Sequence, residues 1–197
     1  MSEQKLNKIC KILMTITAVL LVIFLYMMTI TIISVTNNKM DYVDAPKSDK
    51  IYYIEKLLDD YNTDKHQPLE NVEIKKLVDK NVDLKCYMLF YKDIKPDNTY
   101  GRAFPVFRSI YIDTSLKTHR YAIVLTHEMI HIKHLTVNEM YTQYQTFLYL
   151  FESDDEYLKE CGVYFAYTVL AGWYSDDYDC SFQIIEYFKS KNLYFTV

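Results

Sequence analysis

The segment His127–His131, with the sequence His-Glu-Met-Ile-His, lies within an apolar stretch that predicts one long helix. The stretch runs from residue 121 to residue 135 and contains neither glycine nor proline. Residues four apart share one face of a helix, so His127 and His131 can present their ring nitrogens to one metal ion. Glu128 is rotated by about 100° from His127 and can reach a water on that metal without being a ligand.

An apolar helix is an unfavourable place for these three side chains unless they are paired or bind a metal. The chain has 5 histidines, and three of them, His127, His131 and His134, fall within eight residues. The pattern therefore favours a metal site over a buried helix that carries two histidines and a glutamate by chance.

The wider pattern resembles the active-site helix of the zincins, a family of zinc metallopeptidases. Val124 stands three residues before the first histidine, where the family has Val or Thr. Thr126, Met129, Ile130 and Ile132 are uncharged, as in the family, whereas Lys133 departs from its pattern. The resemblance covers roughly residues 82–175. It implies that His127 and His131 bind Zn2+ and that Glu128 is the general base.

Such a zinc ion needs a third protein ligand. His134 cannot supply it, because seven residues of helix rise about 10 Å while each ligand lies about 2 Å from the metal. The metzincin arrangement also fails, because it needs glycine at position 134 and histidine at position 137, which is Val137.

Glu160 is the predicted third ligand, through a resemblance to the gluzincins. In that group the third ligand is a glutamate on a later helix, followed by small residues, and here Cys161 and Gly162 follow Glu160. The family usually has Ala-Asp at these two positions, so the aspartate that orients the first histidine is missing there. The alternatives are Glu156, then Asp155 and Glu139, and a site that binds no metal.

The N-terminal part of the chain predicts a membrane anchor. Residues 12–35 form a run of 24 residues without a charge, which is long enough for a transmembrane helix. The apolar part of a cleaved signal peptide would be only about 7 to 15 residues long. Lysines flank the run on both sides, and those on the N-terminal side lie closer to it. We expect a single-pass protein whose domain lies on the extracytoplasmic side.

The remaining pattern predicts an α+β protein with three parts: tail and anchor (residues 1–36), a polar stalk (37–50) and a zincin-like domain (51–197). Helices are expected over residues 51–61, 72–78, 121–135, 137–151, 156–174 and 182–188, and strands over 82–91 and 103–113. In zincins the strand before the metal helix is an edge strand that pairs with extended substrate, which here implies residues 107–112.

The expected function is a membrane-anchored zinc metallopeptidase that acts on a peptide or protein substrate. A net charge of −4 without a basic stripe argues against a nucleic-acid partner. Tyr141 and Tyr164 are candidate donors to the oxyanion. The alternative is a catalytically degenerate, zincin-like binding or scaffold protein, against which Glu128 argues because a binding site has no use for a base. A disulfide within the domain is possible if the domain lies outside the cell.

Overall fold

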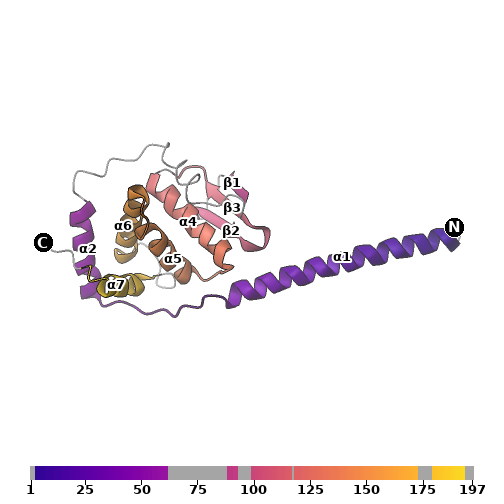
Figure 1. The fold of residues 1–197 in the computed structure, drawn as a ribbon, viewed down its shortest axis with the longest axis horizontal. Helices are drawn as coiled ribbons and strands as arrows, with labels where there is room; N and C mark the ends of the chain where they lie inside the picture. The colour runs from indigo at the N-terminus through magenta and orange to yellow at the C-terminus, as the bar shows by residue number, and fades with distance from the viewer. Residues whose placement is uncertain (1–2, 62–87, 93–98, 117, 173–178, 194–197) are drawn as a thin grey trace.

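The computed structural model describes residues 3–61, 88–92, 99–116, 118–172 and 179–193 (Figure 1). The described part is mostly helical with a small three-stranded sheet, which confirms the α+β class. Its elements are α1 (Glu3–Thr36), α2 (Lys47–Tyr61), β1 (Met88–Lys92), β2 (Gly101–Phe104), the 3-10 helix η2 (Pro105–Phe107), β3 (Ser109–Asp113), α4 (Thr118–His134), α5 (Glu139–Phe151), α6 (Glu156–Leu170) and α7 (Ser181–Ser190). The expected helix over 72–78 and residues 82–87 of the expected first strand lie outside the described residues.

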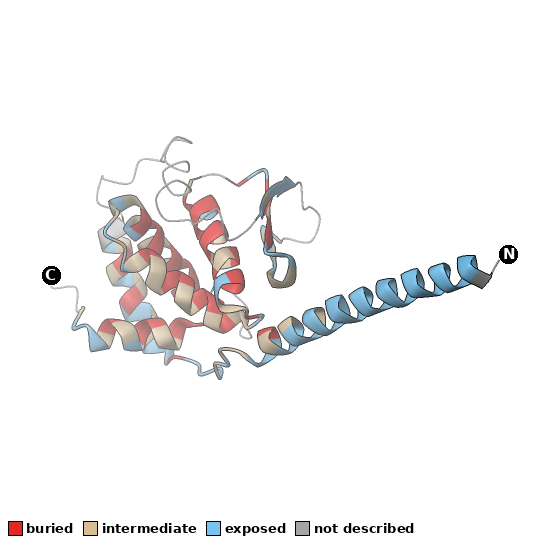
Figure 2. Ribbon diagram, turned by 45° about the vertical axis from the view of Figure 1, so that its right-hand side comes forward, coloured by how far each residue is buried: buried red, intermediate tan, exposed pale blue. Residues whose placement is uncertain are grey.

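Helix α1 is long and apolar enough to cross a membrane. Figure 2 shows that it leaves the rest of the fold and is exposed along most of its length. Four threonines of α1 donate their hydroxyls to backbone carbonyls one turn earlier in the helix; Thr29 Oγ1, for example, donates to the carbonyl of Leu25 at 2.8 Å. Internal hydrogen bonding of this kind is what a helix needs in a medium without water.

The sheet differs from the expected arrangement because the chain turns within residues 103–113. Pro105 has no backbone N–H to donate to a strand ladder, and η2 begins there. Arg108 adopts a left-handed conformation with φ of 48°, and the chain returns as β3. β2 pairs antiparallel and β1 pairs parallel with β3, which gives the order β1-β3-β2. The prediction of residues 107–112 as the edge strand is therefore wrong, and β2 lies at the edge of the described sheet.

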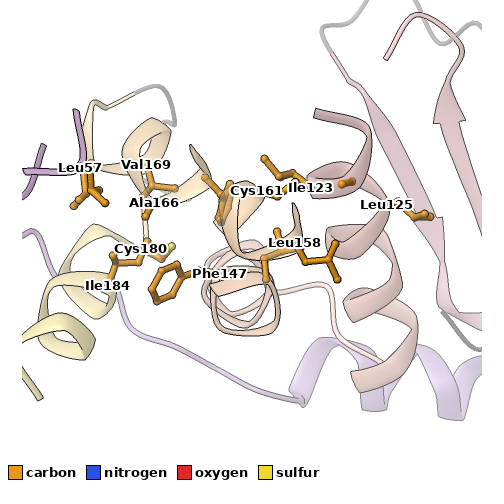
Figure 3. Close-up of a cluster of buried hydrophobic side chains, with 14 of the residues drawn as sticks. Leu57, Ile123, Leu125, Phe147, Leu158, Cys161, Ala166, Val169, Cys180 and Ile184 are labelled. Carbon is orange, nitrogen blue, oxygen red and sulfur yellow. The ribbon is translucent and has the colours of Figure 1, made fainter. Parts of the chain in front are cut away.

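Helix α4 lies between the sheet and the helices α5 and α6 (Figure 1). Leu125 of α4 is fully buried, and Phe147 of α5 and Leu158 of α6 are buried in the same hydrophobic core. Figure 3 shows this core continuing from Leu125 to Leu57 on α2. The helix that carries the His-Glu-Met-Ile-His segment is thus held on both sides.

Two of the cysteines, Cys161 and Cys180, belong to this core. Both are fully buried, and neither forms a disulfide within the described part of the chain. Cys86 lies outside the described residues. Burial raises the pKa of the Cys161 thiol to about 12, so this side chain packs as a small apolar group.

One ion pair joins the start of α2 to the segment before α7. Lys50 Nζ lies 2.8 Å from Oδ2 of Asp179, which is buried, and 3.1 Å from Oδ1 of the exposed Asp44. Burial would lower the pKa of Lys50, but its hydrogen bonds to the two carboxylates outweigh this effect and raise it. A raised pKa means that the stabilisation is present below the usual pKa of lysine and is lost as the pH rises through the folded-state value.

We expect Lys50→Met to reduce the free energy of unfolding at pH 7 by about 1–3 kcal/mol, because the Asp179 carboxylate stays buried without its cation. Lys191→Met is the matched control, since Lys191 and its partner Glu152 are both about half exposed and lie 3.8 Å apart. The Lys191→Met change should reduce the free energy of unfolding by no more than about 0.5 kcal/mol. Thermal unfolding of the two variants is the measurement, and equal losses would contradict the expectation.

Candidate metal centre and active site

The predicted pair of histidines is brought together on α4. The Nε2 atoms of His127 and His131 lie 3.0 Å apart. His131 and Glu128 are buried, whereas His127 is partly exposed. The side chains expected to form the site from their spacing along one helix do converge on one point.

The chain reverses direction at the end of α4 through a Schellman turn over residues 131–136. The backbone N–H of Thr136 donates to the carbonyl of His131 at 3.1 Å, and that of Leu135 donates to the carbonyl of Ile132 at 3.3 Å. Leu135 takes the left-handed conformation, with φ of 45°, that such a turn requires. The turn allows α5 to begin only a few residues later, folded back against α4.

Helix α5 supplies the third member of the metal group. Its first residue is Glu139, and Asn138 caps the helix by accepting a hydrogen bond from the Tyr141 N–H at 2.7 Å. Oε2 of Glu139 lies 3.0 Å from Nε2 of His127, and Oε1 lies 3.4 Å from Nε2 of His131. Ligand atoms about 2.1 Å from a tetrahedral metal lie roughly 3.4 Å from one another. These three side chains could therefore hold a metal ion.

Glu160, the predicted third ligand, lies elsewhere. Its Oε2 is 3.8 Å from Nε2 of His119, at the other end of α4, and it is not part of the metal group. The small residue Gly162 serves a different contact from the expected one. A Cβ there would lie 2.6 Å from the backbone nitrogen of Phe151, so the glycine lets α6 approach the end of α5. Glu139, and not Glu160, is therefore the third residue of the group that could hold a metal ion.

Hydrogen bonding orients His131 for metal binding. Its Nδ1 lies 2.9 Å from the carbonyl oxygen of Thr136, so this nitrogen carries the proton and donates it. Nε2, which lies toward His127 and Glu139, is then the ring nitrogen that could bind a metal. The carbonyl of the Schellman turn thus orients an imidazole in the way that an aspartate often does.

Contacts within this group shift the pKa of Glu139 and the pKa of His131. Burial alone would raise the pKa of Glu139, but its hydrogen bonds with His127 and His131 outweigh burial and lower the pKa well below its usual range. Burial would lower the pKa of His131, but the carboxylates of Glu139 and Glu128 outweigh burial and raise it. The group therefore favours an ionised carboxylate between the imidazoles, which is the state of this carboxyl that binds a cation.

Glu128 lies against the edge strand. Burial raises the pKa of its carboxyl, and the charges of His127 and His131 and a hydrogen bond from the backbone of Ala103 in β2 oppose this effect. A raised pKa means that this carboxylate takes up a proton more readily than an ordinary glutamate does, which suits a general base. The edge strand, the proposed base and the metal group thus meet in one place.

Gly101 of β2 leaves the space that Glu128 occupies. A Cβ at this position would lie 2.8 Å from Oε1 of Glu128 and 2.6 Å from Cγ1 of Val124. Both atoms belong to side chains, so the fold can adapt, but the carboxylate of Glu128 has to move.

If Glu128 acts as a general base, we expect Gly101→Ala to reduce kcat by roughly 100-fold, because a displacement of about 1 Å of a catalytic group has an effect of this size. Metal content should stay the same, since the three ligands are not displaced. The control is Ala103→Gly, which keeps the backbone N–H that bonds Glu128. A Gly101→Ala variant with wild-type kcat would show that the position of Glu128 is not critical.

A pocket with a volume of about 610 Å³ opens over these residues. Its walls come from the metal group, Glu128, β2 and residues of α5 and α6. Gln143 is also in the wall, one helical turn after Glu139; its Oε1 is buried and has no hydrogen-bond partner among the described residues. The two tyrosines considered for the oxyanion lie elsewhere: Tyr141 is hydrogen-bonded to His134, and Tyr164 stacks on His119. Gln143 is one of the polar residues of this wall that the sequence did not indicate.

Comparisons with protein-family models, with curated proteins and with solved structures found no match to the chain. Its functional class therefore has to be argued from the site itself.

Proposed function

We propose that the chain is a membrane-anchored zinc metallopeptidase that hydrolyses peptide bonds. The observation that carries the proposal is the convergence of His127, His131 and Glu139 into one group, with the buried carboxyl of Glu128 on the same pocket. Two imidazoles and a carboxylate form a ligand set typical of catalytic zinc, with one coordination position left for water. The zincin resemblance of the α4 segment supports the same class.

Each side chain has a defined task in this proposal. Zinc held by the three ligands would supply Lewis acidity and lower the pKa of a bound water toward about 7. Glu128 accepts a proton from the attacking water and later delivers it to the leaving amine. The Thr136 carbonyl keeps the His131 ring in place, as the distance of 2.9 Å to its Nδ1 indicates.

The edge strand supplies a binding mode for the substrate. β2 pairs with β3 along one side, and its other side faces the pocket, where Gly101 and Ala103 contribute to the wall. An extended peptide can add to such an edge through backbone hydrogen bonds, largely independent of its sequence. This geometry supports a polypeptide substrate better than a small molecule.

Metal removal and restoration test the proposal. The full chain is incubated with a mixture of random peptides, presented both in solution and on lipid vesicles, and products are identified by mass spectrometry. We expect cleavage that stops when a zinc chelator is added and returns with Zn2+ but not with Mg2+, because imidazole ligands suit zinc and magnesium prefers oxygen ligands. Cleavage that is insensitive to the chelator would contradict the proposal. A metal-loaded chain that cleaves nothing would favour the scaffold alternative.

A further inference from the structure

The turn that joins the metal ligands is hydrogen-bonded to the end of α1. The backbone N–H of Val137 donates to the carbonyl of Ser34 at 3.2 Å. The side chain of Asn37 donates to the carbonyl of His134 at 3.2 Å, and Thr136 Oγ1 donates to the carbonyl of Asn37 at 3.4 Å. Residues 134–137 thus connect His131 and Glu139 on one side with the last turn of the apolar helix on the other.

A second contact places the pocket rim beside α1. η2 contacts α1 and directly follows the edge strand, and its Pro105 lines the pocket. Residues of α1 that are not exposed include Met27, Ile30 and Ser34, which share one face because they are spaced by three and four. Met27 lies about 12 Å along the helix from Val35, where the uncharged run ends. The contact face thus reaches into the apolar run.

Two exposed apolar side chains lie at this junction. Phe107, the last residue of η2, is 59% exposed, and Val137, in the wall of the pocket, is 52% exposed. Both would contact the lipid surface if α1 spans a bilayer, because each belongs to a segment that touches α1. The pocket therefore opens next to the membrane surface.

We infer that the substrates are polypeptides anchored in the same membrane, cleaved within about ten residues of the point where they leave it. The inference rests on the proposed peptidase function. The polar layer of one leaflet is only about 5–8 Å thick, and an extended chain advances about 3.3 Å per residue. About two residues of an extended substrate therefore span this polar layer, and several more residues bring the substrate chain to β2. Anchoring in the same membrane also raises its local concentration at the pocket.

The test compares one peptide library in two forms. Random peptides of about 20 residues, long enough to reach well beyond the pocket, are used free in solution or coupled at one end to a two-chain lipid. The full chain is reconstituted in vesicles, with the Glu128→Gln variant as control. We expect at least tenfold faster, Glu128-dependent cleavage of lipid-coupled peptides in the same vesicles, with the cut sites within about ten residues of the lipid.

Three results would overturn the inference. Equal cleavage of free and lipid-coupled peptides would show that the chain is a peptidase with no preference for anchored substrates. Cut sites spread evenly along the anchored peptides would contradict the position of the pocket. If no peptide in either form is cleaved by metal-loaded protein, the proposed function fails and the inference fails with it.

Fluorescence quenching tests the location of the pocket without any activity. Tryptophan is placed at Phe107, at Val137 or, as the control, at the exposed Asp154 beyond the far end of α5, in a chain whose one tryptophan, Trp173, is replaced by phenylalanine. Lipids brominated on their acyl chains should quench the first two positions and not the third. Equal quenching at all three positions would show that the junction does not face the bilayer.

Discussion

Glu128→Gln is expected to lower kcat by roughly 1,000-fold while the protein keeps its metal and its fold. The amide has nearly the same shape as the carboxyl and can still accept a hydrogen bond from the Ala103 backbone, but it cannot take a proton from water. The measurement is the rate of peptide cleavage at saturating substrate, together with metal content. Glu160→Gln is the control, because this carboxylate lies beside His119 and outside the metal group.

A Glu128→Gln variant with wild-type kcat would contradict the role of Glu128 as base. A variant that loses metal as well as activity would show that Glu128 acts on the metal group itself. A large effect of Glu160→Gln on kcat would point to a second carboxylate in the reaction.

Glu139→Ala is expected to weaken metal binding by at least about 100-fold, whereas Glu160→Ala leaves it unchanged. Removing Glu139 deletes one of the three proposed ligands, so that only His127 and His131 remain to bind the metal. The measurement is the amount of zinc retained after dialysis, followed by competition with a chelator of known affinity. The reverse result, with zinc lost only in Glu160→Ala, would restore the gluzincin arrangement. Zinc retained in both variants would place the third ligand outside the described residues.

The local part of the site could be predicted because it depends on helix periodicity alone. His127, Glu128 and His131 belong to one helix, and their relation follows from 3.6 residues per turn. The start of α6 is equally local: Oδ1 of Asp155, the residue before the helix, accepts hydrogen bonds from the N–H groups of Tyr157 and Leu158.

Glu139 could not be placed in the same way, because its position depends on a turn with a weak sequence signal. Such turns usually carry glycine at the left-handed position, and here Leu135 occupies it. Without a glycine, the sequence does not mark the immediate reversal that brings the first residue of α5 over the histidines. Asn138 marks where α5 begins, since asparagine is a preferred helix cap, but not the direction of the turn.

The prediction of a single strand over residues 103–113 was also wrong, because the chain turns within this range. The alternation of residues 103–113 indicates a strand, but Pro105 and the left-handed Arg108 divide it into β2 and β3. Proline inside a predicted strand indicates an edge or a break, and here both apply. The edge that faces the pocket is consequently β2, whose Gly101 gives Glu128 its space.

The buried cysteines bear on the redox environment in which this fold can form. Cys161 and Cys180 are shielded from solvent, and burial raises the pKa of both thiols, so little reactive thiolate forms at neutral pH. The described core is held by packing, without a disulfide among its residues. The covalent structure of this core is therefore the same in an oxidising and in a reducing compartment. Either side of a membrane is compatible with its stability.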